Sequence, residues 1–556
     1  MHPSSDLDSS VPDLGPDVTV LDPSMPAAAI QRRLDEVFAR QESDEFGPGR
    51  HALLFRPGRY AVRVRVGFYT QVAGLGLVPG DVRIDGQVSA DARWFGGNAT
   101  HNFWRAVENL SVAPGDGGNR WAVSQAAPMR RVHVHGDLLL DDGGWSSGGL
   151  LADARIDGQV RSGSQQQWLS RNTSWGGWTG AAWNMVFVGV ADPPPGAFPD
   201  PPYTVVARTP VVREKPFLHV DGEGRYHVFV PAPRRDSVGV SWADGVPGGI
   251  SIPIGRFHIA RPGDSTETIN AALDAGRHLL LTPGVYHLDG TIRVTRPGTV
   301  VLGLGLPTLV PGTGETAVAV ADVDGVKIAH LLVDAGPVNT PVLMEVGPPG
   351  SSAGHAADPT SLHDVFFRIG GAHPGRASVS LVINSHHVLA DHVWAWRGDH
   401  GEGVGWAVNT ADTGLVVNGD DVTVYGLFAE HYQKHEVVWN GERGRTYMFQ
   451  NERPYDPPDQ ASWMDGPVRG YPAYQVGHSV ARHEAWGLGS YCFFQADPSV
   501  VADRSFEVPD RPGVRLHHMV IVSLGGVGGI HRVVNDTGGP VGGPPGNAIH
   551  HLVDYP

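Results

Sequence analysis

The sequence predicts an all-β chain of two tandem right-handed parallel β-helices that lie side by side. Three observations predict it. A helical stretch followed by a strand and a Gly-Leu-Gly-Leu run occurs twice. Short β-rich runs separated by Gly, Asp and Asn follow each copy, and long amphipathic helical patterns are nearly absent there. Such punctuation is typical of sandwiches, barrels and solenoids, and the internal repeat favours solenoids over the alternative of two unrelated sandwiches.

The repeat is visible directly in the letters. Residues 49–60 read GRHALLFRPGRY and residues 276–286 read GRHLLLTPGVY, about 227 residues further on. The Gly-Leu-Gly-Leu runs begin at Gly74 and Gly303, and the preceding helical stretches are AAAIQRRLDEVFARQ and ETINAALDA. We expect each opening helix to cap the apolar end of its solenoid, because an uncapped end leaves core side chains in water.

These markers divide the chain into three parts. Residues 1–192 form the expected N-terminal β-helix, residues 193–255 a Pro-rich connection, and residues 256–556 a C-terminal β-helix carrying the catalytic acids. The connection begins near DPPPGAFPDPPY and contains a candidate hairpin, FLHVDGEGRYHVFVP. Two solenoids joined in this way form a cleft between them, which suits a polymer-binding site.

Composition excludes several function classes. The 556 residues include 42 Lys and Arg and 58 Asp and Glu, which gives a net charge of −16. Nucleic acids and anionic membranes need basic surfaces, so neither is an expected partner. Cys492 is the single cysteine, which excludes a disulfide framework and a cysteine-based metal site. No run of 18 apolar residues occurs, and the N-terminal MHPSSDLDSSVPDLGPD lacks the regions of a secretory leader.

The densest polar segment begins at Asp391 and contains two acids with informative spacing. Glu430 and Glu452 are 22 residues apart, about one turn of a β-helix, so they are expected on one face. Two carboxyl groups facing a sugar are what glycoside hydrolysis needs. Solvated turn acids are the alternative. It is weakened by nearby aromatic residues, namely Trp394, Trp396, Tyr432, Trp439, Tyr455 and Trp463.

Other polar groups give weaker signals. Asp420 and Asp421 loosely resemble the paired aspartates of pectin-cleaving β-helix hydrolases, but ordinary turns also produce such pairs. His133 and His135 lie two apart on a strand and are able to bind a metal, yet no third ligand stands at a diagnostic spacing. The run 165–167 (Gln-Gln-Gln) is interpreted as a structural amide ladder.

Residues 391–458 resemble the catalytic half of glycoside hydrolase family 55, the exo-acting β-1,3-glucanases or laminarinases. The motifs that carry the resemblance are DHVWAWRGDH, AEHYQKH and QNERPY. In the first half, WAVSQAAPMRR, WSSGGLLAD and SGSQQQWLSRN resemble the same family. The resemblance covers nearly the whole chain, and the internal repeat fits the twin β-helices of that family.

The resemblance implies a role for each matching residue. Glu452 looks like the general acid, and Glu430 looks like the group that holds the attacking water together with Gln125 and Ser147. The register between Ser146 and Ser147 stays open. The residues that look like walls and hydrogen-bonding groups of the terminal glucose subsite are Trp396, Asp399 and Tyr455. No metal or organic cofactor is implied.

Family members invert the anomeric centre, which implies that acid and base stand about 6.5–9.5 Å apart with a water between them. A general acid near neutral pH needs a raised pKa. We expect Phe449, Tyr455 and the charge of Glu430 to raise the pKa of Glu452. Arg453 would oppose this, but adjacent strand residues face opposite sides, so it is expected to point away.

The sequence thus predicts an inverting β-1,3-glucanase that releases glucose from chain ends. Its expected partner is a β-glucan, its expected state a monomer, and its location extracellular by resemblance, although no leader is visible. Three alternatives stay open. An enzyme for another β-glucan linkage would keep the acid and have a different aromatic wall. A β-helix hydrolase or lyase acting on an acidic polysaccharide would need a basic cleft or a calcium site. A non-catalytic carbohydrate-binding β-helix would keep the aromatic residues and tolerate loss of Glu452.

Overall fold

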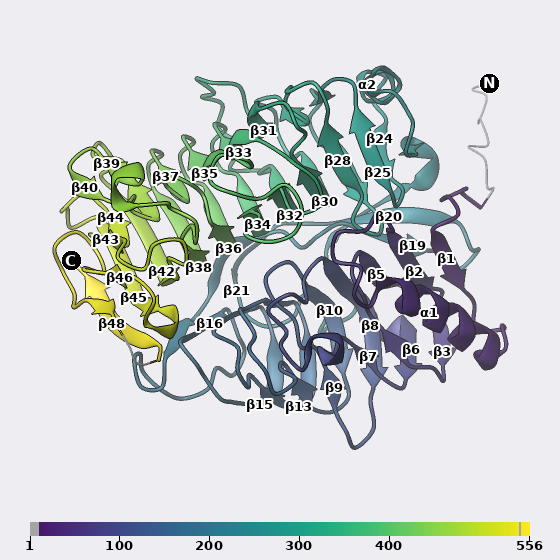
Figure 1. Cartoon of the computed structure of the whole chain (residues 1–556). Coiled ribbons are helices and arrows are strands. Elements are labelled where there is room, and N and C mark those ends of the chain that lie inside the picture. The colour runs from purple at the N-terminus through teal and green to yellow at the C-terminus, as the bar shows by residue number, and fades with distance from the viewer. Residues whose placement is uncertain (1–10, 544–545) are drawn as a thin grey trace.

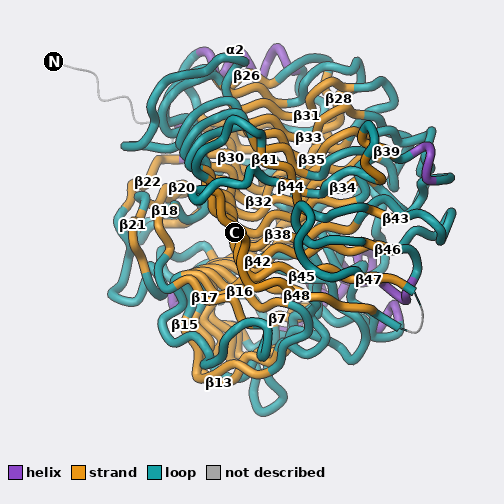
Figure 2. The backbone as a smooth tube through the Cα atoms, turned by 90° about the vertical axis from the view of Figure 1, so that its left-hand side faces the viewer, coloured by secondary structure: helices purple, strands orange, loops and turns teal. Residues whose placement is uncertain are grey.

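The computed structural model describes residues 11–543 and 546–556 and contains two parallel β-helices side by side (Figure 1). Figure 2 shows their strands as two separate stacks. The predicted fold class is confirmed. In the first solenoid, the main parallel path is β1 (Val18–Leu21), β2 (His51–Phe55), β5 (Thr70–Gly74), β8 (Arg105–Ala113), β10 (Met129–Val134), β12 (Leu150–Ala152), β14 (Gln167–Arg171), β16 (Asn184–Val188) and β17 (Tyr203–Val206).

The second solenoid is longer and is built mainly from two sheets. The larger contains β23 (Phe257–Ala260), β24 (His278–Leu281), β27 (Val300–Gly303), β30 (Lys327–Asp334), β32 (Ser361–Ile369), β34 (Leu389–Arg397), β36 (Thr423–Glu430), β38 (Gly444–Glu452), β42 (His483–Cys492), β45 (Val514–Ser523) and the antiparallel β48 (Ala548–Tyr555). The smaller contains β26 (Ile292–Val294), β29 (Val318–Val320), β31 (Thr340–Val346), β33 (Ala377–Ile383), β35 (Ala411–Val417), β37 (Val437–Trp439), β41 (Tyr474–Val476) and β44 (Phe506–Glu507).

The connection between the solenoids has its own small sheets. The expected hairpin is confirmed, because β19 (Phe217–Val220) pairs antiparallel with β20 (Tyr226–Pro231). The other connecting strands are β18 (Thr209–Val212), β21 (Arg234–Ser237) and β22 (Gly249–Pro253). Strand β17 belongs to the first sheet although it lies within the segment assigned to the connection. The boundaries after residues 192 and 255 stay a proposal.

The internal repeat is a structural duplication. Helix α1 (Ala27–Gln41) precedes β2, and α2 (Thr266–Asp274) precedes β24. Tyr60 and Tyr286, which end the two sequence copies, make matching hydrogen bonds. Their hydroxyl groups donate to Leu21 O (3.0 Å) and Arg56 O (2.8 Å) for Tyr60, and to Ala260 O and Thr282 O (both 2.9 Å) for Tyr286. In each solenoid, the equivalent buried tyrosine therefore connects the first turn to the second turn of that same solenoid.

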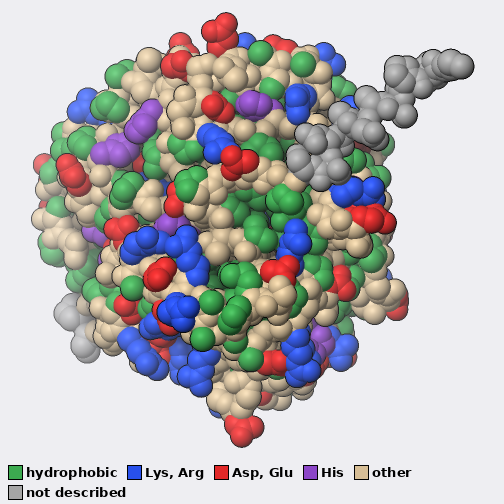
Figure 3. Space-filling view, turned by 90° about the vertical axis from the view of Figure 1, so that its right-hand side faces the viewer, with side chains coloured by type: hydrophobic (Ala, Val, Ile, Leu, Met, Phe, Trp, Pro, Cys, Tyr) green, Lys and Arg blue, Asp and Glu red, His purple; other side chains and the backbone are tan. Residues whose placement is uncertain are grey.

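Both opening helices lie at the same end of the molecule (Figure 1). Over that end, basic and acidic side chains are intermingled (Figure 3). Across the described residues, none of the helices combines the length and apolar character that a bilayer crossing demands. The prediction about a secretory leader rests on the N-terminal segment, and residues 1–10 of that segment lie outside the described part of the structure.

One residue in each long strand of the larger C-terminal sheet has a positive φ. Such a residue interrupts the strict alternation of a strand, so side chains before and after it cannot be placed by counting in twos. These residues follow one another across neighbouring strands: His330, Asp364, His392, Gly426, Met448, Gly487 and His518.

The two solenoids are joined by a shared apolar layer. Trp104 of the first contacts Trp394 and Trp396 of the second, with ring centroids 5.6 and 5.7 Å apart. Gly148 permits the close approach. A Cβ there would lie 2.7 Å from the Gln450 side chain, and its φ of +129° also favours glycine. The interface is therefore tightly packed, and it fixes the position of each solenoid relative to the other.

Beside this layer lies a buried ionic cluster. Arg130 contacts Asp364 (2.8 Å) and Asp391 (2.7 Å), and Arg171 contacts Asp391 (2.9 Å) and Glu214 (2.7 Å). Asp391, which begins the polar segment singled out in the sequence, is therefore an interface residue. Burial raises its pKa, but the two arginines outweigh burial and hold the pKa well below its usual range.

We predict that Asp391→Ala lowers the free energy of unfolding by about 3–5 kcal/mol, because it leaves buried cations without their partner. A depressed pKa contributes stability above the usual aspartate pKa of about 3.9, and that stability is lost as the pH falls. The loss should therefore shrink in acid. Urea unfolding at several pH values measures it. Asp420→Ala is the control, since exposed Asp420 pairs with Arg443 and should matter by under about 1 kcal/mol.

Candidate active site between the solenoids

Two acids stand at the ends of neighbouring parallel strands. Glu430 is the last residue of β36, and Glu452 is the last residue of β38. The register pairs Phe428 with Gln450, so the two acids follow at the same edge of the sheet. Trp396 of the preceding strand is in register with Glu430. The predicted one-turn relation between the two acids is thus present.

A cavity of about 480 Å³ opens over this edge, a size typical of small-ligand sites. Both solenoids and the C-terminal loops line it. The lining residues are Thr100, His101, Phe103, Gln125, Trp145, Ser147, Gln166, Trp394, Trp396, Asp399, His400, Glu430, His431, Glu452, Tyr455, Phe493, Leu524, Gly525 and Asn547. All seven predicted site residues are among them.

The carboxylate of Glu430 is held at both oxygens. Gln125 Nε2 donates to Oε1 at 3.0 Å, and Trp394 Nε1 donates to Oε2 at 2.8 Å. The side chain is buried. Two N–H donors stabilise the ionised form, so Glu430 is built to accept a proton rather than to donate one.

The backbone of Gln125 is held as firmly as its side chain. Its φ is +37°, a strained conformation for a non-glycine residue. His392 Nε2 lies 2.9 Å from the Gln125 carbonyl oxygen, and His392 Nδ1 lies 2.9 Å from Asp364. The ionic interface therefore anchors Gln125. Among the described residues, its Oε1 is buried and has no hydrogen-bond partner.

Two adjacent serines differ in their position. Ser147 lines the cavity, and its N–H donates to Ser124 Oγ at 2.9 Å. Ser146 is fully buried behind it, 3.3 Å from Ser164 Oγ. Only Ser147 can therefore reach a molecule in the cavity.

Glu452 has different neighbours from Glu430. The hydroxyl group of Tyr455 donates to its Oε2. Phe449, expected beside it, instead packs in the solenoid core with its ring 5.3 Å from that of Tyr474. The expectation for Phe449 is wrong because Phe449 and Glu452 are three residues apart on β38, so alternation places them on opposite faces. Arg453 does point away, donating to the backbone carbonyls of two residues outside the cavity, Tyr471 and Arg504.

The pKa values of both acids are raised. Exclusion of bulk water is the largest cause for each. The charge of Glu452 raises the pKa of Glu430 further, while the hydrogen bonds from Trp394 and Gln125 oppose it. For Glu452, His431 and the Tyr455 hydroxyl oppose the rise. The two groups titrate as a pair that retains a proton, and the N–H donors on Glu430 favour that proton on Glu452.

One wall of the cavity is formed by Trp396 and Asp399. Trp396 stacks on Phe46 of the first solenoid, with centroids 6.2 Å apart and planes 6° apart. His400 Nδ1 lies 2.9 Å from Asp399 Oδ1. Burial raises the pKa of Asp399, but the nearby imidazoles of His431 and His400 outweigh it and hold that pKa well below its usual range. An ionised acceptor thus faces the cavity beside an aromatic surface.

Comparison with known proteins identifies the family. The model of the LAM55 pectate lyase-like domain matches residues 257–452. A curated exo-beta-1,3-glucanase of Streptomyces sp. (strain SirexAA-E / ActE) is 55% identical over 534 residues, covering 96% of this chain and 88% of that protein. The chain belongs to glycoside hydrolase family 55.

Solved structures agree with this membership. The structure of sacteLam55A from Streptomyces sp. SirexAA-E matches at a TM-score of 0.96 and 54% identity, covering 98% of this chain and 99% of that one. A variant of sacteLam55A in complex with glucose matches at a TM-score of 0.97 and 54% identity, with the same coverage. The predicted family 55 resemblance is confirmed.

Several lining residues of this family 55 cavity have no assigned role in the sequence analysis. They include His101, Phe103 and Phe493, which come from separate turns and loops. No short-range spacing connects them, because the pairing of the two solenoids brings them together. Two other lining residues could have been predicted from the sequence, because His400 and His431 directly follow Asp399 and Glu430.

The weaker candidates lie elsewhere. Asp420 and Asp421 pair with Arg443 on an outer turn. His133 and His135 share a carboxylate that the spacing did not reveal, with Asp157 at 2.9 and 3.0 Å. Within the 165–167 run, the first glutamine bonds to backbone groups as a ladder would, the second lines the cavity, and the third reaches backbone carbonyls of the other solenoid.

Proposed function

We propose that the protein hydrolyses β-1,3-glucan, releases glucose from chain ends and inverts the anomeric carbon. The observation that carries the proposal is the unequal environment of two neighbouring carboxyl groups in one cavity. Glu430 accepts two N–H hydrogen bonds, whereas Glu452 receives only the Tyr455 hydroxyl. This asymmetry separates a base from an acid, as glycoside hydrolysis requires. The family 55 relative named an exo-beta-1,3-glucanase supports the choice of substrate.

In the proposed reaction, protonated Glu452 gives its proton to the glycosidic oxygen while the bond from that oxygen to C1 breaks. The electron pair of the bond leaves with the departing sugar. A water held by Glu430, Gln125 and Ser147 attacks C1 from the opposite face and gives one proton to Glu430. Proton exchange with solvent then restores both groups. Fixing the water in this way removes much of the entropic cost of its attack.

The subsites follow from the walls. We assign Trp396, Asp399 and Tyr455 to the terminal glucose, since an ionised acceptor beside an aromatic face suits hydroxyl groups on an apolar ring. Trp145 lines the cavity and is 57% exposed, so its flat face is available to the departing part of the chain. In the described part of the chain, neither Lys nor Arg lines this cavity. That disfavours the rival assignment to a uronic-acid polymer.

Water positioning gives a testable contrast between neighbours. We predict that Gln125→Ala lowers kcat by about 10²-fold, because misplacing a reacting group by an ångström costs about that much. Ser147→Ala should lower kcat by roughly tenfold by the same argument. Ser146→Ala is the matched control and should keep kcat within about twofold, since it lies behind the cavity wall. Initial rates on laminarin decide this, and equal losses at both serines would contradict the assignment.

The dependence on pH should be bell-shaped. Below the lower pKa of the pair, Glu430 is protonated and the rate falls; above the higher pKa, Glu452 loses its proton and the rate falls. Because both pKa values are raised, the optimum should lie above the usual glutamate pKa of about 4.3. On β-glucosyl fluoride, whose leaving group needs no protonation, the alkaline limb should disappear. A retained alkaline limb would contradict the role of Glu452.

Substrate class and mode of action need a separate test. Laminarin, cellulose and polygalacturonate are incubated with the enzyme, and products are followed by chromatography. We expect glucose as the first product from laminarin and no release from polygalacturonate. Early accumulation of longer oligosaccharides would contradict exo action. If laminarin gave no product, the hydrolase proposal would fail and the protein would be a carbohydrate-binding one.

We also propose that the protein acts outside the cell, where β-glucans of this type occur, and that it is a monomer. The argument for a monomer is that the two solenoids already bury their apolar faces against each other, through Trp104, Trp394 and Phe428 among others. Light scattering of the purified chain tests this state.

A further inference from the structure

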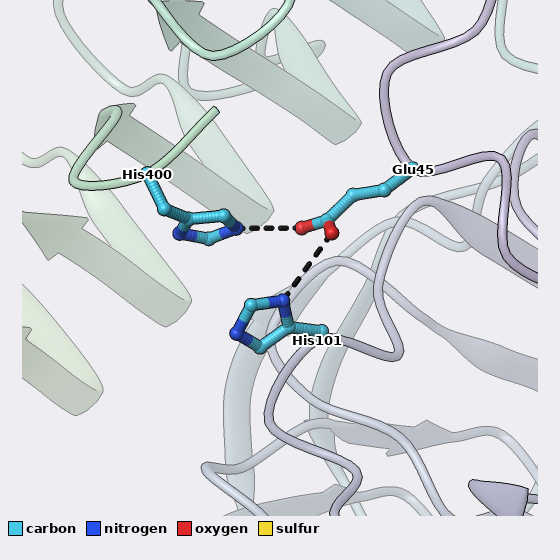
Figure 4. A group of neighbouring side chains, drawn as sticks. All are labelled: Glu45, His101 and His400. Atoms are coloured by element: carbon cyan, nitrogen blue, oxygen red, sulfur yellow. Dashed lines mark hydrogen bonds and ion pairs between the residues drawn. The ribbon is translucent and has the colours of Figure 1, made fainter. Parts of the chain in front are cut away.

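Three side chains from distant parts of the sequence converge at the rim of the cavity (Figure 4). Glu45 and His101 belong to the first solenoid, and His400 belongs to the second. His400 Nε2 lies 2.7 Å from Glu45 Oε1, and His101 Nδ1 lies 3.3 Å from Glu45 Oε2. One ligand atom from each residue lies within 4.8 Å of the others. Both imidazole nitrogens therefore point at one carboxylate, that of His101 from the same solenoid and that of His400 from across the interface.

We propose that Glu45, His101 and His400 form a binding site for a borderline transition-metal dication such as Zn²⁺, and that its occupancy inhibits the enzyme. Two imidazoles and one carboxylate suit Zn²⁺ or Cu²⁺, whereas Mg²⁺ and Ca²⁺ prefer oxygen ligands. Tetrahedral Zn²⁺ with bonds of about 2.0–2.2 Å places its ligands roughly 3.3 Å apart. The 3.3 Å separation of His101 Nδ1 from Glu45 already matches this spacing, and the 2.7 Å separation of His400 Nε2 from Glu45 needs to open by about 0.6 Å.

The site is supported by neighbouring contacts. The Tyr69 hydroxyl donates to the backbone carbonyl of Glu45 at 2.5 Å, which holds the loop against the second solenoid. Asp399 Oδ1 lies 2.9 Å from His400 Nδ1, on the side of the ring away from Glu45. A carboxylate on the far nitrogen is the usual outer partner of a metal-binding histidine, since it fixes the ring and the tautomer.

The surrounding charge also favours a cation. Asp399 and Glu430 line the cavity, and Glu45 lies at its rim beside His101 and His400. A neutral sugar gains little from this negative field, but a dication is attracted by it. Because His101 and His400 are lining residues, an ion held between them would lie at the cavity wall. A hydrated ion there would occupy space beside Asp399 that the terminal sugar needs.

The chain offers an internal control. His133, His135 and Asp157 form a second such group on the outer surface of the first solenoid, away from the cavity. There, Arg155 Nε also lies 3.0 Å from Asp157 Oδ1, so a cation already competes for that carboxylate. An ion bound at this group has no route to block the substrate.

The experiment titrates purified enzyme with ZnCl₂ at pH 7. Binding is measured by calorimetry, and laminarin hydrolysis is measured relative to the metal-free rate of each variant. Wild type, His101→Ala, Glu45→Gln and His133→Ala are compared. The inhibition arm rests on the proposed function, whereas calorimetry tests the site even if laminarin proves not to be a substrate.

We expect inhibition that is competitive with laminarin and reversed by EDTA. His101→Ala and Glu45→Gln should each weaken binding and inhibition by roughly 10–100-fold. His133→Ala should leave the inhibition constant unchanged. The proposal is overturned if wild type shows no binding that His101→Ala removes, or if inhibition survives both rim variants or is lost in His133→Ala.

Discussion

Replacing Glu452 by Gln should lower kcat on laminarin by about 10³-fold, within the 10²–10⁴ range that general acid catalysis contributes. Gln has nearly the same shape but cannot protonate the leaving oxygen. The loss should therefore depend on the leaving group. On β-glucosyl fluoride, Glu452→Gln should retain activity within roughly tenfold of wild type, since fluoride departs without a proton. Steady-state kinetics on both substrates test this.

Stability provides the control for this variant. The raised pKa of Glu452 favours its protonated form in the folded state. Its stabilising contribution is present at low pH and is lost as the pH rises through the folded-state pKa. Gln carries no such charge, so the Tm of Glu452→Gln should equal or exceed that of wild type, increasingly so as the pH rises. A lower Tm at neutral pH would mean that inactivity reflects unfolding.

Replacing Glu430 by Gln should lower kcat by about 10³-fold on both laminarin and β-glucosyl fluoride. A base that accepts the proton of the attacking water is needed whatever the leaving group. The contrast between Glu430→Gln and Glu452→Gln on the fluoride therefore separates the two roles. If Glu430→Gln kept activity on the fluoride and Glu452→Gln lost it, the assignment of acid and base would be reversed.

A milder change isolates the electrostatics of Glu430. Trp394→Phe removes the 2.8 Å hydrogen bond from the indole N–H but keeps an aromatic ring. Losing a donor to the ionised form should raise the pKa of Glu430 further. The acidic limb of the pH–rate profile should then move to higher pH, whereas a purely structural role of the ring would leave that limb in place.

Much of the architecture could be predicted from the sequence because repeats and one-turn spacings are local signals. The duplicated opener predicted two solenoids, and Tyr60 and Tyr286 end it in equivalent environments. The 22-residue spacing of Glu430 and Glu452 predicted neighbouring positions on one sheet edge. Both signals depend only on the regular rise of a parallel β-helix.

What could not be predicted depends on the pairing of the two solenoids. Glu45 and His101 meet His400 only because the first solenoid packs against the second. Asp391 stood in a polar segment typical of a site, yet it is an ionic contact of the interface. Closeness in sequence also misplaced Phe449, which is three residues from Glu452 on β38 and therefore faces the opposite side of the strand.

The central claim is that Glu430 and Glu452 catalyse a single displacement by water. The most direct test is proton NMR of the anomer released during the first minutes of laminarin hydrolysis, before mutarotation. The account predicts α-glucose as the initial product, because water attacks the β-linked C1 from the opposite face. Initial release of β-glucose would contradict it, since retention requires a covalent intermediate on one of the two carboxylates.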